Sequence, residues 1–127
     1  PLDLEVVLVY VVQPIMPQAI EGTTYFTVYD VSARLNEAGE YLAPVAADLR
    51  RQGVRVTIDT RRGEAVAEIV AAARESGADI IAMTTHGRSG LGRILFGSVA
   101  EAVLRQAEIP VLMMRLTERE AAAAEAA

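Results

Sequence analysis

The sequence predicts an α/β protein built on an open parallel sheet, and two features carry this prediction. Several apolar runs rich in β-branched residues are each closed by a proline, a glycine or a polar turn, which is typical of strands buried on both faces of a parallel sheet. Segments with the apolar spacing of helices separate these runs, so the expected order is β-α-β-α-β-loop-α-β. Such alternation favours parallel strands joined by right-handed crossovers, with helices on both faces of the sheet.

The first part of the chain supplies a strand and a long helix. LEVVLVYVVQP, residues 4–14, is a continuous β-branched strand pattern, and an irregular loop is expected from there to about Tyr25. From Val28 to Leu49 apolar residues recur at spacings of three and four, which predicts a helix that ends near Gly53. Pro44 removes a backbone donor inside this helix and is expected to kink it or to divide it in two.

The rest of the chain continues the alternation of strands and helices as far as residue 116, where the pattern ends. We expect a strand at 54–59, a polar turn at 60–63, a helix at 64–76, a strand at 78–85, a helix at 98–107 and a strand at 109–116. Asp79 is interpreted as a turn or cap residue at the start of its strand. One domain is therefore expected over residues 1–116, and residues 117–127 form an alanine-rich tail.

Composition removes several classes of function. The 127 residues contain no cysteine and one histidine, which excludes disulfides, thiolate zinc sites, cysteine nucleophiles and His-rich metal clusters. All twelve basic residues are arginine, so the lysine of a Walker phosphate loop is missing. The net charge of −5 weighs against nucleic acid as a partner. No apolar run approaches the length of a membrane span and no secretion signal is evident, so the expected location is the cytoplasm.

The segment TTHGRSGLGRILFGS, from Thr84 to Ser98, joins the end of a buried strand to the start of a helix. This is where open parallel sheets bind ligands, and the residue types suit a phosphate chain. The residues concerned are Gly87, Gly90 and Gly92 for close backbone approach, Arg88 and Arg93 for charge, and Gly97 with Ser98 for the helix start.

A purely structural interpretation of the same segment is equally open. Ser98 and Glu101 match a capping box, which would satisfy the first helix donors without a ligand. GRSGLG also lacks the glycine spacing of a dinucleotide fingerprint. His86 is interpreted as a structural residue, because no nucleophile and orienting carboxylate accompany it, and no catalytic residue is assigned.

Residues 78–115 resemble the carboxy-terminal signature of the universal stress protein family, whose adenine nucleotide alpha hydrolase-like fold includes ATP-binding members with the motif G-x2-G-x9-G-[ST]. Thr84, Gly87, Gly97 and Ser98 occupy that frame with full spacing, although Thr84 replaces the first glycine. Weaker similarity covers nearly everything from Leu4 to Leu116.

The resemblance implies a five-stranded parallel sheet of order 3-2-1-4-5, with helices on both faces and ATP at the point where the strand order reverses. It also implies a homodimer formed through the last strand, Pro110 to Arg115, and it leaves Mg²⁺ open as a companion ion. The expected nucleotide contacts are Val11, Met83, Thr84, Gly87, Gly97, Ser98, Val99 and Ala100, to which Arg88 is added because of its charge.

One family element is missing from the expected order. Family members begin with a strand and a helix that precede the strand resembled by residues 4–14, so strand 1 and helix 1 are expected to be absent here. Either the sequence is incomplete or another segment fills the central gap. Asp3 is then either the family's adenine-contacting aspartate or a simple lead-in to the strand.

The function predicted from these features is an ATP-binding regulator of the stress response. Because a Walker lysine and an evident base to activate water are both missing, slow hydrolysis is expected at most. The alternative is a dimerisation module of the same fold that binds no nucleotide. A hydrolase or transferase of the alpha hydrolase-like type is a third candidate.

Overall fold

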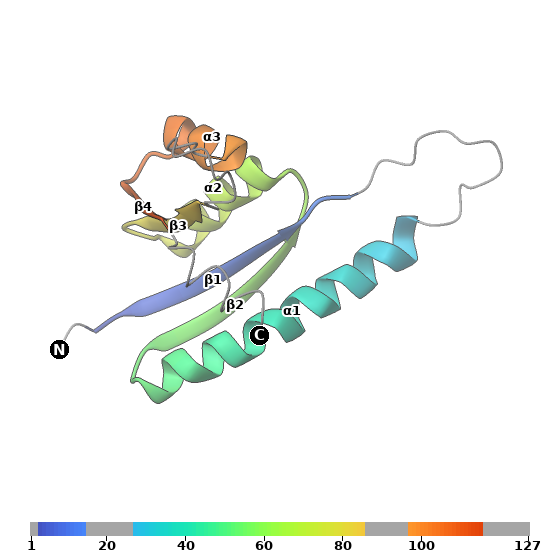
Figure 1. Cartoon of the computed structure of the whole chain (residues 1–127), viewed down its shortest axis with the longest axis horizontal. Coiled ribbons are helices and arrows are strands. Elements are labelled where there is room, and N and C mark those ends of the chain that lie inside the picture. The colour runs from blue at the N-terminus through green and yellow to red at the C-terminus, as the bar shows by residue number, and fades with distance from the viewer. Residues whose placement is uncertain (1–2, 15–26, 86–96, 116–127) are drawn as a thin grey trace. The chain divides into compact units, whose positions relative to one another are not determined.

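The computed structural model describes residues 3–14, 27–85 and 97–115, and its elements follow the predicted order (Figure 1). The elements are β1 (Glu5–Val12), α1 (Thr27–Arg51), β2 (Arg55–Arg62), α2 (Ala65–Ser76), β3 (Ile81–Thr85), α3 (Ser98–Gln106) and β4 (Val111–Arg115). The chain divides into two compact units, Pro1–Ala72 and Ala73–Ala127, and α2 runs across the division.

In the first unit β1 and β2 form a parallel pair, in register from Glu5 opposite Arg55 to Val12 opposite Arg62. The turn predicted at 60–63 is therefore wrong for its first three residues, which continue β2 as far as Arg62. The reason is non-local, because these polar residues find ladder partners in the last part of β1.

Helix α1 is one continuous helix of 25 residues, so the predicted division at Pro44 is wrong. Its end confirms the role expected of Gly53, which has a φ of +87°. The amide of Gly53 donates to the carbonyl of Arg50 and the amide of Val54 donates to that of Leu49. This is the hydrogen-bond pattern of a Schellman motif, in which glycine tolerates the left-handed conformation.

The core of the first unit lies under α1, which contacts β2 more extensively than β1 (Figure 1). Its buried apolar residues are Val12 on β1 and Val31, Ala38, Leu42 and Ala46 on α1, while Val66 and Ala72 are the buried residues of α2. The prediction that residues 4–14 are buried on both faces is wrong, because Val12 is the buried residue of β1 and Tyr10 is 41% exposed. The physical reason is that, among the described residues, β1 has a paired neighbour on one edge.

In the second unit β3 and β4 are parallel, with Ile81 opposite Val111 and Thr85 opposite Arg115. The strand begins three residues later than predicted, and Asp79 lies in a bend before it, as expected of a turn residue. Ile81, Met83, Val111 and Met113 are half-buried, while the even-numbered positions of both strands and Arg115 at the end of β4 are exposed. One face of the pair is therefore covered.

The architecture is an α/β fold with parallel strands, as predicted. Within the part of the chain that the structure describes there are four strands, arranged as two separate parallel pairs, β1-β2 and β3-β4. The five-strand order 3-2-1-4-5 is not seen in this arrangement.

Candidate functional site

The predicted ligand site in the second unit begins at the last residues of β3. Met83 is half-buried and pairs in register with Met113, whereas Thr84 is exposed and pairs with Met114. Strand alternation sends these two side chains to opposite faces of the pair. A ligand at this strand end would therefore meet Met83 on the covered face and Thr84 on the open one.

The start of α3 supplies backbone donors that side chains leave uncapped. Gly97 is the N-cap residue, with φ −56° and ψ 152°, and no side chain of the described residues makes a capping hydrogen bond there. The capping box predicted for Ser98 and Glu101 is therefore wrong. The helix starts one residue earlier than that motif requires, and the Glu101 carboxylate instead accepts a hydrogen bond from Arg105 Nη2 at 2.7 Å.

Topology brings the end of β3 and the start of α3 to the same edge of the second unit. The two strands are parallel and α3 lies between them in the chain, so α3 must run back against the strand direction. Its N-terminus thus lies at the edge where Thr84 and Thr85 end β3. Ala100 and Val103 are buried and anchor this helix on its apolar side.

The central part of the predicted site lies outside the described residues. His86, Gly87 and Arg88 belong to the segment 86–96, for which the structure gives no description. Gly97, Ser98, Val99 and Ala100 are described, and they span the exposed start of α3 and its first buried residue. Of the four motif positions, Thr84, Gly97 and Ser98 are therefore among the described residues, and Gly87 is not.

The two candidates in the first unit have separate surroundings. Val11 is half-buried near the end of β1 and pairs in register with Arg61. Asp3 directly precedes β1, and its carboxylate accepts a hydrogen bond from Arg55 Nη2 at 3.3 Å while its side chain is 86% exposed. Such an exposed pair contributes little to stability.

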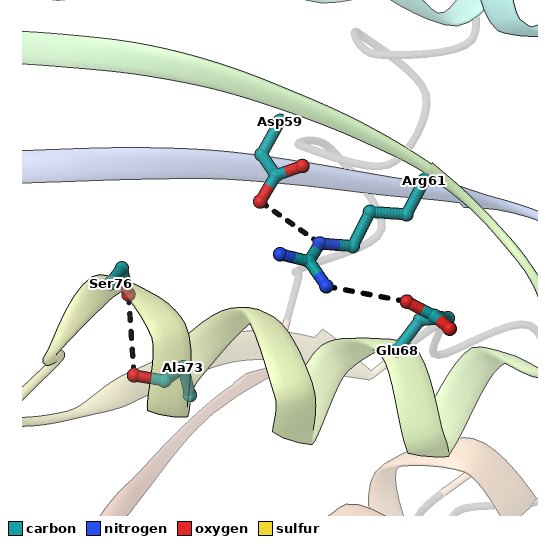
Figure 2. A network of polar contacts seen from close by, with 5 residues as sticks. All are labelled: Asp59, Arg61, Glu68, Ala73 and Ser76. Carbon is teal, nitrogen blue, oxygen red and sulfur yellow. Dashed lines mark hydrogen bonds and ion pairs between the residues drawn. The ribbon is translucent and has the colours of Figure 1, made fainter.

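A polar network between β2 and α2 was missed by the sequence analysis (Figure 2). Arg61 Nε donates to Asp59 Oδ2 at 2.9 Å, and its Nη1 donates to Glu68 Oε2 at 3.3 Å. The Arg61 side chain is 16% exposed, so these bonds hold a largely buried guanidinium. The sequence offered no clear local signal, because the apolar alternation of Val54, Val56 and Ile58 stops there and residues 59–62 are all polar.

The start of α2 adds two further links to this region. The Glu64 carboxylate accepts hydrogen bonds from the amides of Val66 at 3.1 Å and Ala67 at 2.8 Å, and so caps the helix. The amide of Gly63 donates to the carbonyl of Val12 at 3.0 Å. The network therefore fixes the β2-α2 connection, and its contacts are structural.

Neither a metal-binding cluster nor a membrane-spanning helix is found among the described residues. No group of three or more His, Cys, Asp or Glu side chains there is arranged to hold a metal ion. No helix in that part of the chain is long and apolar enough to cross a membrane.

Parallel strands joined through helices define the class of open α/β proteins. Within this class the profile of the universal stress protein family matches residues 2–115. The chain belongs to that family.

Known relatives agree with this assignment. The chain is 37% identical over 121 residues to universal stress protein MJ0531 of Methanocaldococcus jannaschii, which covers 93% of this chain and 69% of the relative. Among solved structures, that of hypothetical protein MJ0577 aligns with a TM-score of 0.74 at 30% identity, covering 90% of this chain and 77% of that one. A family member from Burkholderia pseudomallei aligns with a TM-score of 0.63 at 30% identity, covering 85% and 71%.

Proposed function

We propose that this protein is a cytoplasmic, ATP-binding regulator of the stress response. The observation that supports it most is the uncapped start of α3 at the end of the motif frame. Three amide groups there, those of Ser98, Val99 and Ala100, have no side-chain cap among the described residues and face the end where anions bind helices.

The proposed contacts rely on backbone more than on side chains. The amides at the start of α3 would hold the phosphates, Gly87 would let the backbone approach them closely, and Arg88 would neutralise charge. Met83, Thr84 and Val11 would line the base and ribose. A magnesium ion, if it accompanies ATP, would depend on phosphate oxygens and water, because the described residues offer it no carboxylate cluster.

Slow hydrolysis at most is part of the proposal. The sequence contains no lysine, so no lysine ammonium group can neutralise the negative charge that develops on the leaving phosphate during hydrolysis. A protein that binds ATP and turns it over slowly stays in the nucleotide-bound state for long periods, which suits a regulator.

The proposed assembly follows the family fold. The pairs β1-β2 and β3-β4 match the two outer pairs of the order 3-2-1-4-5, whose central strand would join them. Dimerisation is proposed through Pro110 to Arg115, which includes β4. Leu112 and Met114 support this, because they are 48% and 55% exposed and a second copy would cover apolar surface there.

Thr84 favours a second candidate, a dimerising module of the same fold that binds no nucleotide. Its side chain is exposed at the end of β3, where the family motif has glycine. A side chain at this position occupies space that the motif leaves for the nucleotide.

Thermal stability measured against ATP concentration separates the two candidates. A ligand that binds the folded protein alone stabilises it by about 2.7 kcal/mol at a hundred times its dissociation constant. Gly97→Val is the diagnostic variant, because Gly97 has an ordinary φ and no described atom lies within 4 Å of the position of an added Cβ.

Gly97→Val should cost about 1 kcal/mol of stability without ATP, because glycine is preferred to valine at an N-cap, and it should also reduce the further shift that ATP produces. Gly39→Ala, on α1, serves as the control that changes a glycine far along the chain from the motif. An absent shift for the wild-type protein at millimolar ATP would refute nucleotide binding and leave the second candidate.

A further inference from the structure

A cavity of about 250 Å³ lies in the first unit, between the last part of β1 and the middle of α1. The spacing of the lining residues in the sequence explains why they share this cavity. Strand positions two apart lie on one face of a strand, and helix positions three, four and seven apart lie on one face of a helix. The lining residues are Tyr10 and Val12 from β1, and Arg34, Glu37, Ala38 and Tyr41 from α1.

Two tyrosine rings form a corner of this cavity. The ring centroids of Tyr10 and Tyr41 are 6.1 Å apart and the planes meet at 70°. The pair is T-shaped, with the edge of one ring toward the face of the other, so a cation in this corner would lie over the face of one ring and beside the other. The negative charge density of the ring face attracts it. Both rings remain accessible to solutes, since Tyr10 is 41% and Tyr41 is 67% exposed.

The two charged residues of the lining have opposite signs and are not paired with each other. Arg34 Nη1 donates to the carbonyl of Gln13 at 2.8 Å, which fixes the guanidinium beside the end of β1. No ion pair joins Arg34 to Glu37 within the described contacts, although they are three residues apart on the helix. The cavity therefore offers one anionic and one cationic group at separate positions.

This combination selects among small ligands. A primary ammonium group needs several hydrogen-bond acceptors, whereas a quaternary ammonium group needs contact surface and a nearby negative charge, which the rings and Glu37 supply. A ligand with a phosphate chain would place its charge against the Glu37 carboxylate. A carboxylate on the ligand, in contrast, has the Arg34 guanidinium as its partner.

We propose that this cavity binds a small betaine-type zwitterion, with its quaternary ammonium group in the Tyr10–Tyr41 corner beside Glu37 and its carboxylate directed at Arg34. The site uses residues of the first unit alone. It is independent of the proposed nucleotide site, none of whose residues line it.

The test is a titration of the whole chain with glycine betaine, followed by the NMR signals of the tyrosine rings and of the ligand methyl groups. We expect saturable binding with upfield shifts of the methyl signal, because the methyl groups lie over ring faces. The carbon isostere 3,3-dimethylbutanoate keeps the shape and the carboxylate but lacks the cation, and it should bind at least about fivefold more weakly.

Variants identify the residues responsible. Tyr41→Ala and Glu37→Gln should each weaken glycine betaine binding by about threefold or more, as loss of a cation–π contact or of a counter-charge predicts. Glu40→Gln is the matched control, because Glu40 is exposed on the same helix and does not line the cavity. The circular dichroism spectrum of each variant verifies its fold.

Three results would overturn the proposal. The first is the absence of a saturable shift up to about 50 mM glycine betaine, a concentration at which even millimolar binding would be detected. The second is equal affinity for glycine betaine and 3,3-dimethylbutanoate, and the third is an equal loss of affinity in Glu37→Gln and Glu40→Gln. Because the readout contains no nucleotide, none of these results depends on whether the protein binds ATP.

Discussion

Replacing the described glycines by alanine, one at a time, tests how closely the backbone specifies this fold. Gly39 lies inside α1, and an added Cβ there would meet no atom within 4 Å. Alanine should stabilise the protein at this site by about 0.5–1 kcal/mol, because glycine weakens a helix interior by that amount. Gly53 and Gly77 also have open space, but their φ values of +87° and +66° make alanine unfavourable by about 1–2 kcal/mol.

Gly63 combines both penalties and should be the most sensitive position. Its φ is +149°, and an added Cβ would lie 2.8 Å from Glu68 Cγ, which real contacts do not reach. Glu68 would have to move, and with it the 3.3 Å bond to Arg61 Nη1. Backbone strain and the weakened charged hydrogen bond together predict a loss of about 2–4 kcal/mol for Gly63→Ala.

Urea denaturation followed by circular dichroism, at one fixed protein concentration, measures these differences as shifts of the midpoint with an unchanged slope. The double variant Gly63→Ala/Glu68→Ala separates the two causes, because it removes the crowded atom and leaves the strained backbone. The cost of Gly63→Ala should fall by about 1 kcal/mol in the Glu68→Ala background. Equal costs in both backgrounds, or a destabilising Gly39→Ala, would contradict the reasoning.

Three further predictions concern charge, assembly and the motif. Arg61→Met should lower the free energy of unfolding by about 1.5–3 kcal/mol in the urea assay, because it leaves the half-buried carboxylates of Asp59 and Glu68 without their guanidinium partner. Arg105→Met, on the exposed surface of α3, should change the same free energy by less than about 0.5 kcal/mol. Met114→Glu should convert the proposed dimer to a monomer, as measured by light scattering, whereas Leu104→Glu on α3 should leave the dimer intact. A monomeric wild-type protein would refute the proposed interface. Thr84→Gly should raise the affinity for ATP in the thermal assay, and unchanged affinity would remove Thr84 from the site.

Local signals in the sequence predicted the helix ends well. Gly53 and Gly77 each follow a helix and close it with the same pair of backbone bonds, for Gly77 from its own amide to Arg74 and from Ala78 to Ala73. The two residues joined by each of these hydrogen bonds are at most five positions apart, so a short stretch of sequence is enough to predict them.

Non-local causes account for the errors. The end of β2 depends on Tyr10, Val11 and Val12, which lie about fifty residues earlier and give residues 60–62 their ladder partners. Burial of β1 depends on which strand lies at its second edge, and no pattern within residues 4–14 contains that information. The continuity of α1 through Pro44 likewise depends on the packing of Leu42 and Ala46 on either side of it.

Comparing the surroundings of Gly63 and Gly97 says more about the candidate site than the number of glycines in the segment 84–98 does. The fold itself requires glycine at 63, where φ is positive and Glu68 crowds the position. At 97 the backbone has values that any residue adopts, and no described atom opposes a side chain. The N-cap position is one local reason for glycine at 97, and a ligand that approaches the amides of α3 would supply a second. Gly97→Val tests the second reason, because a role confined to the N-cap would lower stability and leave the shift produced by ATP unchanged.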